Sequence, residues 1–154
     1  MKELSLDPVV LMVDDDPDDH LLVREALSEN GRPANLQQLM DGQDLIEYLR
    51  GCSEEEDPSR PPRPDLILLD LNMPGKDGRD TLRELKSCAD PDFRGIPVVI
   101  LTTSRDAKDV QACYSLGASS FIEKPSGFEQ LVDIMRVLSS YWFDVARLPK
   151  AMHA

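Results

Sequence analysis

The sequence predicts an α/β protein with a parallel sheet whose two faces are covered by helices. Short apolar runs alternate along the chain with longer amphipathic segments, which is the pattern of repeated strand and helix units. The runs are apolar throughout, as in strands buried on both faces, and each ends abruptly on polar residues. With 154 residues, the chain fits one domain, assigned to residues 5–149 with a tail at 150–154.

The first strand is the apolar run at 9–13, which an acidic stretch follows. Pro17 suits the first position of a helix and Asp16 its N-cap. We therefore expect a helix from there to about Glu29, where Gly31 ends it. Its buried face is assigned to Leu21, Leu22, Ala26 and Leu27.

The second strand is the weaker run at 36–40, and Asp41 and Gly42 turn the chain into a second helix. The apolar residues of that helix are Leu45, Ile46, Tyr48 and Leu49. Residues 51–63 are rich in proline, serine and acidic residues without apolar periodicity, which predicts a solvated loop inserted within the domain. The acidic run at 54–57 inside this loop is expected to be a solvated surface rather than a site.

Three further strands are predicted at 66–69, 97–101 and 120–122. The helices that follow them are expected to run to about Cys88, from about Asp106 to Gly117, and from about Phe128 past Trp142. Right-handed crossovers leave few arrangements of such a chain, and we favour the flavodoxin-like order 2-1-3-4-5. In that order, the carboxyl ends of the first and third strands flank a crevice where ligands bind.

The composition excludes several classes of function. A formal net charge of −12 disfavours binding to nucleic acid or to an anionic membrane surface, because both need clusters of lysine and arginine. No apolar run approaches the roughly 20 residues that span a membrane, and the N-terminus does not resemble a signal peptide, so we expect a cytoplasmic protein. The spacing of Cys52, Cys88 and Cys113 fits neither a zinc site nor a disulfide framework, so these thiols are expected to be reduced.

Polar residues at the carboxyl ends of four predicted strands should meet at this crevice. They are Asp14 and Asp15 after the first strand, Asp70 after the third, Thr102 after the fourth and Lys124 after the fifth. Clustered carboxylates repel one another unless a cation holds them together, and oxygen ligands favour Mg²⁺. A lysine and a hydroxyl beside such a metal suit a phosphoryl group, and Asp70 can then act as the nucleophile.

Over residues 9–140, these features resemble the motif of the receiver domains of two-component response regulators. The shared elements are the acidic pair Asp14-Asp15, the segment Asp70-Leu71-Asn72-Met73-Pro74, Thr102 and Lys124-Pro125. Each element alone is weak, but the ordered set is specific. The resemblance implies a signal transduction protein in which Asp70 accepts a phosphoryl group from the phosphohistidine of a histidine kinase.

The resemblance also implies a set of magnesium ligands. Asp15 would hold Mg²⁺ directly, Asp14 directly or through a water molecule, and Asp70 and the backbone carbonyl of Asn72 would complete the protein ligands. The protein would catalyse only its own phosphorylation and dephosphorylation, and would not be an enzyme that acts on a separate substrate.

Further residues would sense the phosphoryl group. Thr102 would bond one of its oxygens, Lys124 would pair with it, and the aromatic ring of Phe121 would move inward as the threonine shifts. Asn72 and Ser104 occupy the positions that tune the reaction rate in this family. Partners would read the surface formed by the predicted helix at 106–117, the strand at 120–122 and the helix that starts at Phe128.

The loop at 51–63 and the ending at 139–149 resemble the small single-domain response regulators associated with bacterial phytochromes. A phytochrome-type histidine kinase is therefore the expected partner in a phosphorelay, with no output domain after the last helix.

The alternative is a phosphotransferase or phosphatase of the haloacid dehalogenase kind that acts on a separate substrate. That family needs a second aspartate two residues after the nucleophile, where this chain has Asn72. A binding module that has lost its chemistry is a third reading, which the intact residue set does not support.

The last helix is predicted to have two apolar faces. Leu131, Ile134, Met135 and Leu138 follow helical spacing and should pack on the sheet. The second face continues past the expected edge of the domain, and such a face usually marks a contact surface. We therefore expect a homodimer through Val137, Tyr141, Trp142, Val145 and Leu148.

The remaining polar candidates receive structural interpretations. Asp16, Asp18 and Asp19 are assigned to the N-terminus of the first helix, where acids cap the backbone and complement the helix dipole. His20 and His153 are expected to be exposed and without function.

Overall fold

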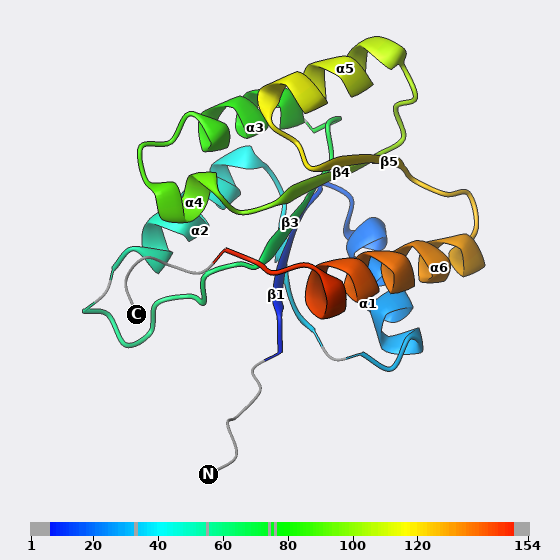
Figure 1. Cartoon of the computed structure of the whole chain (residues 1–154), viewed down its shortest axis with the longest axis horizontal. Helices are drawn as coiled ribbons and strands as arrows, with labels where there is room; N and C mark the ends of the chain where they lie inside the picture. Colours follow the sequence, from blue (N-terminus) through cyan, green and yellow to red (C-terminus); the bar gives the residue numbers. More distant parts are fainter. Residues whose placement is uncertain (1–6, 33, 55, 74, 76, 150–154) are drawn as a thin grey trace.

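Five parallel strands form one sheet in the order β2-β1-β3-β4-β5, as the sequence predicts. The computed structural model describes residues 7–32, 34–54, 56–73, 75 and 77–149 (Figure 1). The predicted tail at 150–154 and His153 lie outside the described residues. The strands are β1 (Val9–Val13), β2 (Asn35–Leu39), β3 (Leu66–Leu69), β4 (Val98–Thr102) and β5 (Ser120–Glu123).

The helices follow the predicted alternation with one addition, the short α4. It lies between α3 and β4, where the sequence analysis predicted only a connection, because a single turn is too short to show apolar periodicity. None of the helices in the described part of the chain combines the length and the apolar character needed to cross a bilayer. The helices are α1 (Pro17–Glu29), α2 (Gly42–Cys52), α3 (Gly78–Lys86), α4 (Pro91–Arg94), α5 (Ala107–Leu116), α6 (Phe128–Ser139) and the π-helical segment η1 (Ser140–Val145).

Aspartate N-caps begin most of these helices and account for part of the negative charge. The side chain of Asp16 accepts a hydrogen bond from the backbone N–H of Asp18, which confirms the predicted start of α1. Four further aspartates, Asp41, Asp77, Asp90 and Asp106, cap α2, α3, α4 and α5 in the same way. Each cap satisfies a backbone donor that the helix itself leaves unpaired. In the described part of the chain, α6 begins at Gly127 without a side-chain cap, and η1 continues directly from it, also without one.

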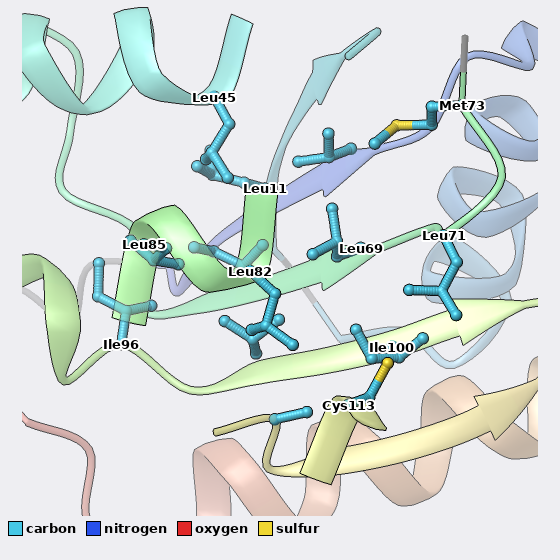
Figure 2. Close-up of a cluster of buried hydrophobic side chains, with 14 of the residues drawn as sticks. Leu11, Leu45, Leu69, Leu71, Met73, Leu82, Leu85, Ile96, Ile100 and Cys113 are labelled. Atoms are coloured by element: carbon cyan, nitrogen blue, oxygen red, sulfur yellow. The ribbon is translucent and has the colours of Figure 1, made fainter. Parts of the chain in front are cut away.

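The sheet separates two hydrophobic clusters. Figure 1 shows α2, α3 and α5 on one side of the sheet and α1 and α6 on the other. Leu11 and Val13 belong to the cluster beneath α2, α3 and α5, whereas Val10 and Met12 belong to the cluster beneath α1 and α6. Figure 2 shows the first cluster, where Leu82 of α3 meets strand residues such as Leu69 and Ile100. Both faces are therefore covered, which is why the strands are apolar throughout.

The predicted buried face of α1 is partly wrong. The buried residues are His20, Val23, Ala26 and Leu27, whereas Leu21 and Leu22 are exposed. The sequence analysis expected an exposed His20, but the Nε2 of its ring lies 2.7 Å from the carbonyl oxygen of Asp14 and the side chain is buried. The polar His20 is part of the buried face of α1. An assignment from apolar residues alone therefore places that face about one residue too far along the sequence.

Long-range polar contacts anchor the irregular segments. The hydroxyl of Tyr48 donates to the carbonyl oxygen of Pro62 at 2.7 Å, which holds the exposed loop after α2 against that helix. Arg32 and Asp144 form an ion pair between the end of α1 and η1. All three cysteines are free, as predicted.

Gly78 allows α3 to start directly beneath the end of β3. Its backbone N–H donates to the carbonyl oxygen of Leu71 at 3.0 Å. A Cβ atom at this position would lie 2.2 Å from the carbonyl oxygen of Asp70 and 2.7 Å from the Cα of Leu71. Only glycine fits this close approach, which places α3 against the segment that begins with Asp70.

We expect Gly78→Ala to lower the free energy of unfolding by about 2 kcal/mol, since crowding a packed site costs roughly 1–3 kcal/mol. Urea unfolding followed by circular dichroism measures the change. Gly127→Ala is the control, because the nearest atom to its added Cβ lies at 3.9 Å. The control should lose less than about 1 kcal/mol, through the poorer N-cap preference of alanine. Equal losses in the two variants would contradict the close approach at Gly78.

Candidate functional site

Three carboxylates gather at the carboxyl edge of the sheet, as the sequence predicts. One carboxylate oxygen from each of Asp14, Asp15 and Asp70 lies within 4.8 Å of the others. The first and third follow β1 and β3, which pair as neighbours with Val13 opposite Leu69. Asp14 and Asp70 are buried, whereas Asp15 is exposed.

Backbone hydrogen bonds extend the sheet to these acids. The N–H of Asp14 donates to the carbonyl oxygen of Leu39, and the N–H of Asp70 donates to that of Val13, both at 3.0 Å. One carboxylate oxygen of Asp14 also accepts the N–H of Asp16 at 2.9 Å. The positions of the two buried acids are therefore set by strand pairing and by the start of α1.

The donor set fits a divalent cation with a preference for oxygen ligands. Burial raises the pKa of Asp14 above its ordinary value, although the hydrogen bond from Lys124 opposes this shift. The Oδ1 atom of Asp70 is buried and makes no hydrogen bond within the described part of the chain. Crowded carboxylates with an unpaired oxygen are favourable when a cation binds them, so Asp14, Asp15 and Asp70 can together hold a divalent metal.

Lys124 reaches this acidic cluster from β5. Its backbone N–H donates to the carbonyl oxygen of Thr102 at 2.7 Å, which fixes the residue just after β5 beside the end of β4. Its Nζ atom lies 2.7 Å from Oδ2 of Asp14, 2.6 Å from Oδ2 of Asp19 and 3.8 Å from Oδ2 of Asp70. Burial lowers the pKa of Lys124, but its hydrogen bonds to the acids outweigh burial and leave the pKa raised.

Asp19 is a site residue that the sequence analysis missed. It was assigned to the N-terminus of α1 together with Asp16 and Asp18, but its carboxylate forms an ion pair with Lys124. A signal was present in the spacing, because Asp19 lies one turn before the buried Val23 on the same side of α1. Asp18, by contrast, is exposed in the first turn, as predicted.

Thr102 is buried at the end of β4, and its hydroxyl oxygen has two donors nearby. The side-chain amide of Asn72 donates to it at 3.4 Å, and the backbone N–H of Ser104 donates to it at 3.5 Å. The segment after Asp70 and the segment after β4 therefore meet at the hydroxyl of Thr102. Pro74, the last residue of the predicted motif, lies outside the described residues.

Ser104 belongs to a polar network at the start of α5. Its hydroxyl donates to Asp109 at 2.6 Å, and Asp109 also forms an ion pair with Arg79 of α3. Phe121 of β5 is half-buried against the first hydrophobic cluster, and its N–H donates to the hydroxyl of Tyr114 at 3.2 Å. The rate-tuning role of Asn72 and Ser104 and the switch role of Thr102 and Phe121 stay predictions.

The second face of the last helix is partly exposed. Val137, Tyr141 and Val145 have relative exposures of 59%, 52% and 68%. Trp142 is half-buried against the second hydrophobic cluster and meets the ring of Tyr141 edge to face, with centroids 5.0 Å apart. Leu148 is half-buried. The exposed part of the predicted dimer surface therefore centres on the first three residues.

Chemically, the arrangement suits attack by a carboxylate on phosphorus. Asp70 can supply the attacking oxygen, the other acids can hold a cation, and Lys124 and Thr102 offer donors for phosphoryl oxygens. The position two residues beyond Asp70 holds Asn72, so the second aspartate of the haloacid dehalogenase alternative is missing.

Comparisons with known proteins agree with this geometry. The response regulator Rcp1 of Synechocystis sp. is 39% identical over 143 residues, which are 93% of this chain and 94% of Rcp1. The crystal structure of the Mn²⁺-bound form of Rcp1 has a TM-score of 0.78 and 39% identity over 92% of this chain and 99% of that one. The structure of the phosphorylated cyanobacterial phytochrome response regulator RcpA has a TM-score of 0.81 and 38% identity over 94% of this chain and 100% of that one.

A family model described as the response regulator receiver domain matches residues 10–136, which include every residue of the carboxylate cluster together with Thr102 and Lys124. The chain therefore belongs to the response regulator receiver domain family.

Proposed function

We propose that Asp70 accepts a phosphoryl group from the phosphohistidine of a histidine kinase, with Mg²⁺ as the cation of the site. The observation that supports this most directly is the convergence of Asp14, Asp15, Asp70 and Lys124 from three separate strands on one edge of the sheet. In the transfer, a carboxylate oxygen of Asp70 bonds to phosphorus as the bond from phosphorus to the histidine nitrogen breaks. The electron pair of that bond stays on the imidazole.

Each neighbouring residue has a defined part in this reaction. Mg²⁺ would be bound by Asp14, Asp15, Asp70 and the backbone carbonyl of Asn72, and when bound it offsets the negative charges of the phosphoryl group and the carboxylate. Lys124 is placed to donate to a phosphoryl oxygen on Asp70, since its Nζ already lies 3.8 Å from that carboxylate. Dephosphorylation would proceed at the same residues, so the protein turns over no separate substrate.

The output would be a change at the surface formed by α5, β5 and α6. Thr102 is buried, and the hydrogen bonds to its hydroxyl are long, so a phosphoryl oxygen would offer a stronger partner. A shift of Thr102 would draw the following loop, where Ser104 holds the start of α5 through Asp109. Phe121 would then turn inward from its half-buried position, and Asn72 and Ser104 would tune the rate.

A phytochrome-type histidine kinase is the proposed partner, in the cytoplasm. RcpA is described as a phytochrome response regulator, and it matches this chain over nearly its whole length. A kinase must also approach the crevice, and the exposed apolar side chains of Leu22 and Phe128 line the same pocket as Lys124. Nucleic acid is not a proposed partner, because the net charge is −12.

A homodimer through α6 and η1 is proposed as the assembly state. Val137, Tyr141 and Val145 are spaced by four residues along this helical segment and are all exposed. Such a stripe is larger than the scattered apolar residues of an ordinary surface. A second copy of the same face would cover it symmetrically, with Trp142 and Leu148 at its border.

We expect wild-type protein incubated with acetyl phosphate and Mg²⁺ to gain the mass of one phosphoryl group on Asp70. Asp70→Asn should abolish the gain, because an amide is a poor nucleophile, whereas the exposed Asp18→Asn should retain it. Intact-mass spectrometry followed by peptide mapping locates the group. Phosphorylation of the Asp70→Asn variant to the wild-type extent would refute the assignment.

Metal binding supplies a second expectation. Asp15→Asn should weaken the binding of Mg²⁺ and of Mn²⁺ by about tenfold or more, because it removes one anionic ligand without disturbing the core. Isothermal titration calorimetry of the wild type, Asp15→Asn and the control Asp18→Asn makes the comparison. Equal affinities in all three proteins would exclude Asp15 as a ligand.

The dimer can be tested by multi-angle light scattering. The wild type should give twice the chain mass of 17.3 kDa, and Val145→Asp should give the monomer mass, because a buried unpaired charge opposes association. Met40→Ser changes an exposed apolar residue elsewhere and should remain dimeric. A monomer mass for the wild type, with and without a phosphoryl donor, would remove the proposal.

A further inference from the structure

Asp19 occupies a position that the metal and phosphoryl chemistry does not account for. Its carboxylate lies 2.6 Å from Nζ of Lys124, yet Asp19 is not among the three acids whose oxygens cluster within 4.8 Å. Its side chain is 28% exposed, and that of Lys124 is 14% exposed. The pair therefore lies at the rim of the site, partly shielded from solvent, where a charge-assisted hydrogen bond is stronger than on an open surface.

Lys124 and a divalent cation compete for the same acids. The ammonium group bonds to Asp14 at 2.7 Å and lies 3.8 Å from Asp70, and both of these acids belong to the metal cluster. A cation that binds there must share those carboxylates with a positive charge a few ångströms away. Of the three acids near Nζ, Asp19 alone lies outside the cluster.

We propose that Asp19 is a positioning residue that holds the ammonium group of Lys124 at the rim of the site and so leaves Asp14 and Asp70 available to the divalent cation. This inference rests on the proposed function of the same site. Asp19 is fixed for this role by its place in the first turn of α1, whose start is set by the Asp16 cap. Lys124 stays close enough to Asp70 to reach a phosphoryl group there.

In this arrangement, the effect of Asp19 on the affinity for the cation depends on Lys124. Without the carboxylate of Asp19, the ammonium group shifts its hydrogen bonds toward Asp14 and Asp70, and the cation must displace it. Without the lysine, Asp19 has no ammonium group to hold, and its loss should matter only through the negative charge of a carboxylate outside the metal cluster.

The test is a double-mutant cycle on cation affinity, measured by isothermal titration calorimetry with Mg²⁺ alone and with Mn²⁺ alone. Asp19→Asn should weaken binding about tenfold or more, the size expected from losing one charge-assisted hydrogen bond. Asp18→Asn removes the same charge from an exposed position in the same first turn of α1 and should weaken binding by less than about twofold. In the Lys124→Gln background, the effect of Asp19→Asn should be clearly smaller than in the wild type, because only its charge still acts on the site.

Two results would overturn the inference. If Asp19→Asn and Asp18→Asn change the affinity equally, Asp19 acts only as a surface charge. If the full effect of Asp19→Asn persists in the Lys124→Gln background, Asp19 acts on the cation directly. Urea unfolding of each variant checks the fold, and Lys124→Met serves as a second lysine variant should Lys124→Gln not fold.

The readout separates this inference from the proposed function. Cation affinity is measured without any phosphoryl donor, so it is interpretable even if Asp70 does not become phosphorylated. In the converse result, the wild type becomes phosphorylated on Asp70 while the substitutions of Asp19 and Lys124 have additive effects on cation affinity. That result would leave the proposed function intact and would remove only the role of Asp19.

Discussion

The crowding of like charges at the carboxyl edge of the sheet is the constraint on which the rest of the site depends. β1 and β3 pair in register up to Val13 and Leu69, so the residues that follow them, Asp14 and Asp70, are held side by side. These acids cannot move apart without breaking the hydrogen bonds of the two strands. A positively charged group must therefore lie close to these acids, and in the described part of the chain that group is the ammonium of Lys124.

Much of the fold and the core of the site could be predicted because their signals are local. Strands buried on both faces are apolar throughout, and each ends where polar residues begin, so a run such as Leu66–Leu69 also marks Asp70 as a residue of the sheet edge. Right-handed crossovers leave few possible orders of the strands, and the favoured order, which the structure has, places Lys124 beside Asp14 although 110 positions separate them.

The errors arose where a polar residue has a tertiary partner that its own segment does not reveal. His20 is buried because the carbonyl oxygen of Asp14 lies beside its ring, and without that contact the phase of α1 was assigned to Leu21 and Leu22. Asp19 was interpreted as one more acid at a helix N-terminus, since its pairing depends on where β5 ends. α4 was missed because its single turn shows no periodicity.

The charge balance of the site explains why the cation should be divalent. Three carboxylates, those of Asp14, Asp19 and Asp70, lie near the ammonium group of Lys124, and Asp15 adds a fourth through its cluster with Asp14 and Asp70. The crevice is therefore strongly negative, on a protein whose formal charge is already −12. A phosphoryl donor is itself an anion, and such a crevice repels it. A monovalent cation would remove only part of this excess. A divalent cation would bring the crevice close to neutrality, and it would do so beside Asp70, where the phosphoryl group of the proposed reaction would arrive.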